Sequence, residues 1–296
     1  MPHGGGTAMV GRVAIVTGGL RGLGKAMAIG LAEAGYRVLA AGHIAEDLAP
    51  MQAAARARGI PDEALQPALS DIRDPEACTA LVEAARARFG GLHILVNNAG
   101  LTFTTISPDK FRRPKPQPFW ECGDGLVQAV MDTNFTAADR LARRVVPYLL
   151  EQGWGRIINV TTKLDTMNRP GSSPYGPSKA ALEMATEIWA KELAGTGVTA
   201  NIVNPGSGAN TPGMAEEWRA GSRNGTMPVL LEPEAMVAPL LFVVSDEASE
   251  VNGYRFDANS WDGTLPPALA ARRNARPAGF VLHAAAAWDA APAQLG

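Results

Sequence analysis

Short apolar segments alternate along the chain with longer, alanine-rich segments of helical period. Strands that are apolar on both faces and separated by helices are typical of a parallel sheet with helices on both faces. Repeated units of this kind predict an α/β fold, a doubly wound parallel sheet of about seven strands in a single domain. The predicted strands are residues 13–17, 37–41, 65–69, 92–97, 156–161, 198–203 and 253–258, and the predicted helices are residues 24–34, 75–89, 125–150, 175–193 and 233–244.

Three segments fall outside this alternation. Residues 102–121 contain four prolines, which exclude a regular helix or a central strand and predict a surface loop. Residues 206–232, rich in glycine, asparagine and methionine, form a second irregular connection. Residues 264–296 are a tail dominated by alanine and proline, for which a packing arm and a disordered end are both open. We therefore place one domain at residues 10–263, after a flexible N-terminus at residues 1–9.

Composition and charge narrow the class of protein. With 27 basic and 29 acidic side chains the formal net charge is −2, whereas proteins that neutralise a nucleic-acid backbone carry a positive excess. No apolar run reaches the roughly 18 residues that span a bilayer, and the first residues lack the pattern of a secretory signal. Two cysteines and four histidines show neither a disulfide framework nor metal-ligand spacing. We expect a cytoplasmic protein without a metal, a nucleic-acid partner or a membrane span.

A glycine-rich turn follows the first predicted strand. In the sequence Thr-Gly-Gly-Leu-Arg-Gly-Leu-Gly, Gly18, Gly22 and Gly24 let the backbone approach a phosphate closely. The helix that follows offers free N–H groups and a partial positive charge at its N-terminus. A tight turn could require the same glycines without any ligand, so this motif alone does not show that the turn binds a phosphate.

Further polar motifs follow other predicted strands, at the strand ends where open α/β sheets bind ligands. Residues 97–100 (Asn-Asn-Ala-Gly) end the fourth strand. Asp71 and Ile72 follow the third strand, and the carboxylate could accept a hydrogen bond from an adenine amino group. Tyr175 and Lys179 lie four residues apart, and hence on one face of a predicted helix.

Taken in order, these motifs resemble those of the short-chain dehydrogenase/reductase family, over about residues 10–263. The resemblance implies a Rossmann-type domain, a nicotinamide dinucleotide, and hydride transfer to or from a carbonyl or alcohol carbon. Members are mostly homodimers or homotetramers, and here residues 125–150 and 175–193 would be the contact helices.

The resemblance also implies the catalytic roles. Tyr175 matches the family's acid/base, and Lys179 would bind the nicotinamide ribose and lower the tyrosine pKa from its ordinary value of about 10. Thr162 stands where the family commonly has a serine that orients the substrate carbonyl, so the hydroxyl is kept and a methyl is added. Asn134 matches an asparagine that supports a water relay to the lysine.

The second strand predicts which dinucleotide binds. An acidic residue after it favours NAD, but here Gly42 and His43 bring no carboxylate. Arg21 resembles the basic residue that members preferring NADP hold against the 2′-phosphate, unless it is only a solvated loop residue. We therefore predict NADP(H), with NAD less favoured. The residues expected to bind it are Gly18, Leu20, Arg21, Gly22, Leu23, Gly24, Gly42, His43, Asp71, Ile72, Asn98, Ala99, Gly100, Tyr175, Lys179, Pro205, Gly206 and Gly208.

The substrate side is less informative. Residues 206–232 correspond to the family's substrate loop, where Met214, Trp218 and Met227 either form an apolar lining or only pack the loop. A cationic cluster within residues 112–115 either meets an anionic substrate, such as an acyl carrier, or is a solvated face. Trp261 could close the pocket.

The function favoured by these observations is an NADP(H)-dependent oxidoreductase. Its partner would be a small-molecule carbonyl or alcohol, hydrophobic or acyl-type, as in a 3-oxoacyl reductase. The alternative is a catalytically weak NADP-binding protein that serves as a regulator or scaffold on the same fold.

Overall fold

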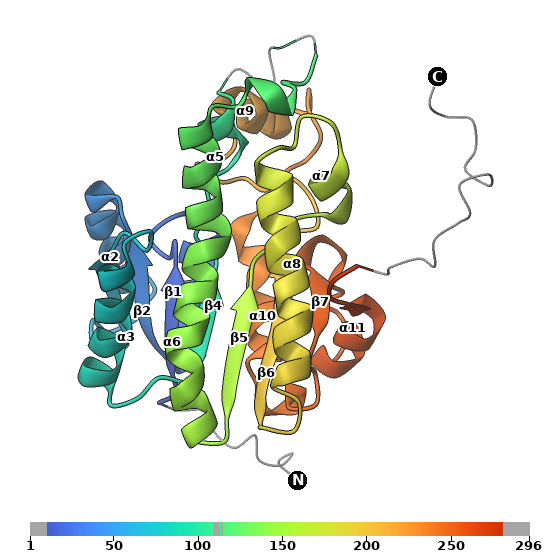
Figure 1. Ribbon diagram of the computed structural model, residues 1–296. Helices are drawn as coiled ribbons and strands as arrows, with labels where there is room; N and C mark the ends of the chain where they lie inside the picture. The colour runs from blue at the N-terminus through green and yellow to red at the C-terminus, as the bar shows by residue number, and fades with distance from the viewer. Residues whose placement is uncertain (1–10, 109–112, 114, 281–296) are drawn as a thin grey trace, which may run out of the picture.

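The computed structural model describes residues 11–108, 113 and 115–280. A sheet in the order β3-β2-β1-β4-β5-β6-β7-β8 forms its centre (Figure 1). All neighbouring strands are parallel except β7 and β8, and the predicted doubly wound α/β fold is confirmed. The strands are β1 (Val13–Thr17), β2 (Arg37–Gly42), β3 (Leu65–Leu69), β4 (Ile94–Asn97), β5 (Gly155–Asn159), β6 (Val198–Asn204), β7 (Tyr254–Asp257) and β8 (Arg276–Pro277).

Helices cover both faces of the sheet. They are α1 (Gly22–Glu33), α2 (Leu48–Ala57), α3 (Pro75–Phe89), α4 (Phe103–Ile106), α5 (Asp124–Met131), α6 (Ala137–Glu151), α7 (Leu164–Asn168), α8 (Tyr175–Glu192), α9 (Glu216–Asn224), α10 (Val237–Val243) and α11 (Pro267–Asn274). Alternate strand residues face opposite layers: Ala14 and Val16 join the core with α1 and α10, whereas Val13 and Ile15 join the core with α3 and α6. Two dry cores therefore hold the strands in register.

Local signals in the sequence explain where individual helices begin and end. In α3, the Asp74 side chain accepts a hydrogen bond from the Glu76 backbone N–H at 2.9 Å, and Pro75 takes the first helical position. The helix ends at Gly90, whose φ of +78° suits a residue without a side chain.

The predicted helix at residues 125–150 is one helical run with an irregular centre. Between α5 and α6, residues Asp132–Thr136 form a π-helical turn. Such turns shift the side chains that follow and are frequent at functional positions. This one contains Asn134, which the sequence singled out for a catalytic role.

The irregular segments contain structure that periodicity did not show. Residues 102–121 include α4 and a 3-10 turn at Phe119–Glu121, and residues 206–232 include α9. The first part of the predicted tail forms α11, which packs on α10, and β8, which pairs with β7. The predicted N-terminus at residues 1–9 and tail residues 281–296 lie outside the described part of the chain.

The strand order reverses between β1 and β4, which are neighbours in the sheet. Ligands of doubly wound folds bind at such a switch point, outside the carboxyl ends of the strands. In Figure 1 these ends point towards α5, α7 and α9. Among the described residues, no helix is both long and apolar enough to cross a membrane.

Candidate active site

The turn between β1 and α1 depends on two glycines with positive φ. Gly18 has a φ of +60° and Gly22 a φ of +54°, a region that residues with a Cβ rarely adopt. A Cβ at Gly18 would lie 2.9 Å from the side-chain nitrogen of Asn98, and one at Gly24 would collide with the Gly18 carbonyl oxygen. The packing of the turn itself therefore requires these glycines.

Hydrogen bonds from the end of β4 hold this turn in place. The Thr17 hydroxyl accepts from the backbone N–H groups of Asn98 at 3.0 Å and Ala99 at 3.1 Å, and donates to the Val96 carbonyl at 3.3 Å. The Asn98 side chain donates to the carbonyl oxygens of Thr17 at 2.9 Å and Gly18 at 3.2 Å. Asn98 thus joins two strands at the switch point.

The N-terminus of α1 fits an anion. The helix starts at Gly22, and Arg21 before it makes no side-chain hydrogen bond to the first backbone N–H groups. Uncapped N–H groups and the positive end of the helix dipole form a phosphate site. Thr211 lies against this turn: a Cβ added to Gly22 would be 3.2 Å from the Cβ of Thr211. Sequence reasoning did not single out Thr211, since it lies in a segment without periodicity.

Some of the residues predicted to bind the cofactor pack against the phosphate turn through apolar side chains. Leu20 is buried, and a Cβ at Gly42 would come within 2.8 Å of its side chain. Leu23 packs against one core and Ile72 is buried in the other. These residues shape the site through packing, while Gly100 is exposed after β4.

Two side chains predicted to contact the dinucleotide, Arg21 at its 2′-phosphate and Asp71 at its adenine, are held in ion pairs. Arg21 forms a bidentate pair with Asp47, in the turn after β2, with one of the two hydrogen bonds at 2.7 Å. Asp71 accepts a hydrogen bond from Arg73 at 2.9 Å, which holds the pKa of that carboxyl below its usual range. The charge of His43, which is exposed, has the same effect on Asp71.

On α8, Tyr175 is the first residue and Lys179 lies one turn later, as predicted. The Lys179 ammonium is buried and donates to the Val160 carbonyl at 2.8 Å. It also lies 3.4 Å from the position of a Cβ on Gly100, at the end of β4. Burial lowers the pKa of Lys179 to about 8, because the low-polarity surroundings disfavour the charged form.

Asn134 connects this helix to the segment after β4. Its side chain accepts from the Leu101 backbone N–H at 2.7 Å, and donates to the Leu101 carbonyl at 3.2 Å and the Ser178 hydroxyl at 3.0 Å. Ser178 in turn donates to the Tyr175 carbonyl at 2.7 Å. The π-helical turn therefore places Asn134 between the two segments that carry Gly100 and Tyr175.

The environment of the Tyr175 phenol differs in one respect from our expectation. Burial raises the pKa of Tyr175, while a hydrogen bond with Thr162 and the positive charge of Arg169 oppose that rise. We expected Lys179 to be the residue that lowers this pKa. Thr162 replaces the serine that the family commonly has, and its hydroxyl is one of the two groups that oppose the rise in the Tyr175 pKa.

Two residues that the sequence did not single out lie near Tyr175: Phe103 contacts its ring, and Arg169 lies against Phe103. The Phe103 ring lies 4.7 Å from the Tyr175 ring, centroid to centroid, at an angle of 50°. The Arg169 guanidinium carbon lies 5.8 Å from the Phe103 centroid, within the range of a cation–π contact. Both come from irregular segments, where no periodic signal could have marked them.

A buried charged cluster supports the backbone at Thr162. Arg255 on β7 donates to the Thr162 carbonyl at 3.0 Å and pairs with Glu183 at 2.7 Å and Asp257 at 3.2 Å. Glu183 also accepts from the Thr161 hydroxyl at 2.9 Å. All of these groups are at most 8% exposed. The cluster therefore ties the end of β5 to α8 and β7.

The predicted Pro205–Gly206 turn follows β6 at the same edge. The Asn204 side chain accepts from the Gly206 backbone N–H at 2.8 Å, and Asn259 packs against Gly206. Gly208 is exposed beside Leu230, to which a Cβ would come within 2.8 Å. The turn is thus fixed, whereas Gly208 begins the irregular segment.

The aromatic and methionine side chains that could line a substrate pocket differ in how deeply they are buried. Met227 packs on Gly221 of α9, which supports packing within the loop, and Trp218 is half-buried. Trp261 is partly buried and packs against the core, with its ring centroid 6.0 Å from that of Phe242 and 6.2 Å from that of Phe256.

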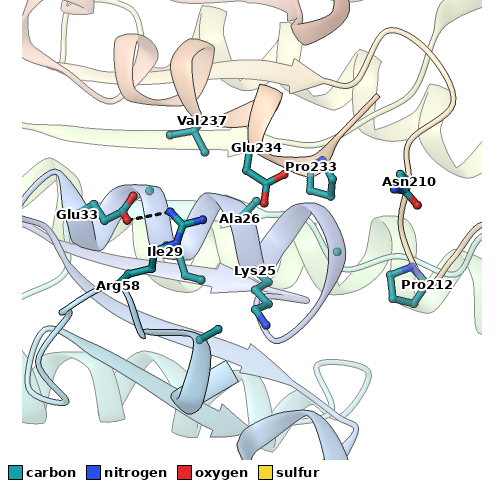
Figure 2. A pocket seen from close by; sticks show the side chains of 13 residues that line it. Lys25, Ala26, Ile29, Glu33, Arg58, Asn210, Pro212, Pro233, Glu234 and Val237 are labelled. Carbon is teal, nitrogen blue, oxygen red and sulfur yellow. Dashed lines mark hydrogen bonds and ion pairs between the residues drawn. The ribbon is translucent and has the colours of Figure 1, made fainter. Parts of the chain in front are cut away.

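A cavity of about 540 Å³ lies beside α1, and Gly22 of the phosphate turn is among the residues that line it. Figure 2 shows Lys25 and Glu234 at this cavity, and the ion pair between Glu33 and Arg58, at 3.0 Å. Neither Tyr175 nor the other α8 side chains line it. The cavity therefore adjoins the phosphate turn, whereas Tyr175 and Lys179 are not part of its lining.

The sequence of the chain matches the family profile of short chain dehydrogenases over residues 12–222. The chain belongs to the short-chain dehydrogenase/reductase family. A relative, the 3-oxoacyl-(acyl-carrier-protein) reductase of Thermotoga maritima, is 31% identical over 248 residues, covering 82% of this chain and 94% of the relative.

Two solved structures of the family resemble the fold. An actinorhodin polyketide ketoreductase with NADPH has a TM-score of 0.68 and 28% identity, covering 81% of this chain and 93% of the other. A 3-ketoacyl-(acyl-carrier-protein) reductase from Brucella melitensis, complexed with NADH, has a TM-score of 0.70 and 26% identity, covering 84% and 96%.

Membership of the short-chain dehydrogenase/reductase family identifies the protein as an oxidoreductase that acts on a carbonyl or alcohol carbon with a nicotinamide dinucleotide. The residues at the strand ends fit this cofactor. The uncapped α1 N-terminus suits a pyrophosphate, and the buried ammonium of Lys179 suits ribose hydroxyls. Among the described residues, no group of three His, Cys, Asp or Glu side chains could hold a metal ion.

Proposed function

We propose that this short-chain dehydrogenase/reductase is an NADP(H)-dependent reductase of a small, hydrophobic or acyl-type carbonyl compound, with an activity like that of a 3-oxoacyl reductase. One observation carries the proposal. Tyr175 is the first residue of α8, and the buried ammonium of Lys179 lies one turn later on the same helix. Relatives named as a 3-oxoacyl reductase and a polyketide ketoreductase support the carbonyl class.

In the direction of reduction, Tyr175 donates its phenolic proton to the substrate oxygen as the carbonyl becomes an alcohol. The bound nicotinamide supplies the hydride that the carbonyl carbon accepts. Thr162 donates a hydrogen bond to the same oxygen and orients it. In the direction of oxidation, Tyr175 takes the proton back from the alcohol.

Lys179 and Asn134 prepare Tyr175 for these steps. The Lys179 ammonium, which donates to the Val160 carbonyl, also donates hydrogen bonds to the ribose hydroxyls of the bound cofactor. Its positive charge then favours the phenolate form of Tyr175. Asn134 holds Ser178 and the Leu101 backbone, and supports a water relay that returns a proton to Tyr175.

Two features support a preference for NADP(H) over NAD(H). Gly42 and His43 at the end of β2 bring no carboxylate near the adenosine ribose. The Arg21 side chain remains 45% exposed although it is paired with Asp47, so the guanidinium can contact a 2′-phosphate. Asp47 opposes this preference, because its carboxylate competes for Arg21.

We also propose a homodimer or homotetramer with α5, α6 and α8 at the contacts, as in the family. A cytoplasmic location is supported by the two cysteines, Cys78 and Cys122, which are both free thiols.

The test of the proposed function is the substitution Tyr175→Phe. We expect turnover of a ketone panel to fall about 100-fold or more, because the proton donor is lost, while NADPH fluorescence titration gives an unchanged affinity. Tyr254→Phe, which removes an exposed hydroxyl on β7, serves as the control and should retain full turnover. Full turnover by the Tyr175 variant would remove this residue from the acid/base role.

The alternative function is that of a catalytically weak NADP-binding regulator or scaffold. It is favoured if the wild-type protein binds NADPH but oxidises none of it across the panel. Tyr175 and the buried ammonium of Lys179 lie one turn apart on α8. This arrangement argues for catalysis, since a regulator does not need a phenol beside a lysine.

A further inference from the structure

A second cavity, of about 490 Å³, lies between residues 115–120 and residues 169–173. We call it the Trp120 pocket. Phe119 and Trp120 line it and are 69% and 74% exposed, with their rings packed edge to face at 5.3 Å between centroids. Large aromatic side chains beside a concave surface are typical of a binding site for a ligand with a planar or apolar part.

The charges of this pocket are positive. Lys115 and Arg169 line it, and none of the described residues of its wall is acidic. The carboxylate of Glu121, next to Trp120 in the chain, pairs instead with Arg113 at 3.7 Å. An ammonium on one wall and a guanidinium on the other favour a carboxylate or a phosphate group, because both cations donate hydrogen bonds to anionic oxygens.

The two walls are packed against each other before any ligand binds. A Cβ at Gly171 would lie 2.5 Å from the Pro116 side chain. The Cys122 thiol donates to the Ser173 carbonyl at 3.7 Å, which joins the first segment to the second. Proline residues at 116, 118 and 170 restrict the backbone further. A preformed pocket lowers the entropy lost on binding.

The Trp120 pocket adjoins the proposed catalytic group. Ser173, on its wall, is two residues before Tyr175. The Arg169 guanidinium lies over the Phe103 ring, and that ring contacts the ring of Tyr175. The Phe103 ring therefore contacts both the pocket's arginine and the ring of Tyr175. A substrate whose carbonyl oxygen meets Tyr175 can extend past Phe103 into the pocket.

We propose that the Trp120 pocket binds the far end of the substrate, and that this end carries an anionic group, a carboxylate or a phosphate, on a planar or apolar stem. Lys115 and Arg169 bind the anion, and Phe119 and Trp120 contact the stem. This inference rests on the proposed function, since it places the reacting carbonyl at Tyr175. It defines the substrate class as carbonyl compounds with a remote negative charge.

The test compares matched ketones with the NADPH-loaded full-length protein. One pair is 4-acetylbenzoate and its methyl ester, and a second is the longer 4′-acetylbiphenyl-4-carboxylate and its methyl ester. A third ketone, 4-acetylphenyl phosphate, distinguishes phosphate from carboxylate. We expect kcat/KM for at least one anion to exceed that of its neutral analogue about tenfold or more, through a lower KM, as charge-assisted hydrogen bonds provide.

Two variants assign the effect to the pocket. Lys115→Gln and Arg169→Gln should each reduce the ratio of kcat/KM between anion and ester towards one. The ratio is the decisive quantity, because Arg169 also acts on Tyr175 and its loss changes turnover of both ketones. Arg143→Gln is the matched control. Arg143 is an exposed arginine on α6, paired with Asp139, and its loss should leave the ratio unchanged.

The outcomes separate this inference from the proposed function. If acids and esters are reduced alike and the pocket variants change nothing, the inference is wrong and the reductase stands. If no ketone is reduced, calorimetry with 4-acetylbenzoate still tests whether the pocket binds an anion. Binding to the wild-type protein that is lost in Lys115→Gln supports the inference, and equal binding to both contradicts it. If Trp120→Ala only dissociates a dimer in sedimentation and leaves the ratio unchanged, the surface joins two copies and the inference is overturned.

Discussion

At the phosphate turn, backbone groups shape the proposed cofactor site, whereas on α8 the side chains of Tyr175 and Lys179 form the proposed catalytic site. The turn consists of Gly18, Gly22 and Gly24, tied by hydrogen bonds to Thr17 and Asn98. Its groups are neutral, and each polar atom named here has a partner in the fold. Stability and function therefore require the same residues there.

The situation on α8 is the opposite. The Lys179 ammonium is buried with the Val160 carbonyl as a neutral partner, at 2.8 Å, and its pKa is lowered to about 8. A charge buried without a counter-ion costs free energy of folding. The comparison indicates that hydrogen bonds within the fold stabilise the phosphate turn, whereas the buried ammonium of Lys179 lowers the free energy of unfolding.

The largest expected effect is on α8, where Lys179→Met should stabilise the protein. The lysine pKa is lowered from 10.5 to about 8 by burial, which corresponds to roughly 3 kcal/mol at about 1.4 kcal/mol per unit. A base with a depressed pKa is destabilising below that pKa, and the cost disappears as the pH rises towards the unfolded value. The gain should thus be greatest at pH 7 and shrink towards pH 10.

Urea denaturation of the cofactor-free protein between pH 7 and pH 10 measures this difference. Lys191→Met is the matched control, because Lys191 is exposed on the same helix and pairs with Glu187 at 2.6 Å. It should give a small, pH-independent change. A stability difference for the Lys179 variant that is equal at all pH values would show that burial of this charge is not the cause.

At the phosphate turn the expected effect has the opposite sign and is somewhat smaller. Gly24→Ala should destabilise the protein by about 1–3 kcal/mol, since its Cβ collides with the Gly18 carbonyl. The same change should weaken NADPH binding, because the turn must move. Gly263→Ala adds a Cβ into open space and should be neutral in both measurements. If Gly24→Ala is destabilised but binds NADPH with normal affinity, the packing of this turn is needed for stability and not for cofactor binding.

The contrast between the two regions also explains what the sequence could predict. The parallel strands, the phosphate turn and the pair Tyr175 and Lys179 follow from short-range patterns, in which periodicity or spacing along one element decides the geometry. The glycines of the turn are recognisable because few other residues adopt their backbone conformation. The end of strand β5 differed by two residues, since apolar residues continue into the loop.

The side chains around the phenol could not be found in this way. Arg169 and Phe103 contact the site from irregular segments, and Arg255 reaches the Thr162 carbonyl from 93 residues further along the chain. Such contacts depend on the packing of remote segments, and no local pattern encodes them. The predicted loop at residues 102–121 was recognised by its prolines, but the pocket that it forms was not.

The smallest expected effect is on the choice between NADPH and NADH, at Arg21, whose side chain lies next to the backbone phosphate turn. Its guanidinium is shared with Asp47, whose side chain is 15% exposed. Asp47→Asn should free Arg21 for a 2′-phosphate and remove a repulsive carboxylate, raising the ratio of NADPH to NADH affinity about fivefold, as for a partly exposed ion pair. Asp62→Asn, which breaks the exposed pair with Arg56, is the control and should leave the ratio unchanged. Fluorescence titration with both dinucleotides measures it. If Asp47→Asn instead weakens NADH alone, Asp47 is the acidic residue absent from the end of β2, and the preference is for NAD.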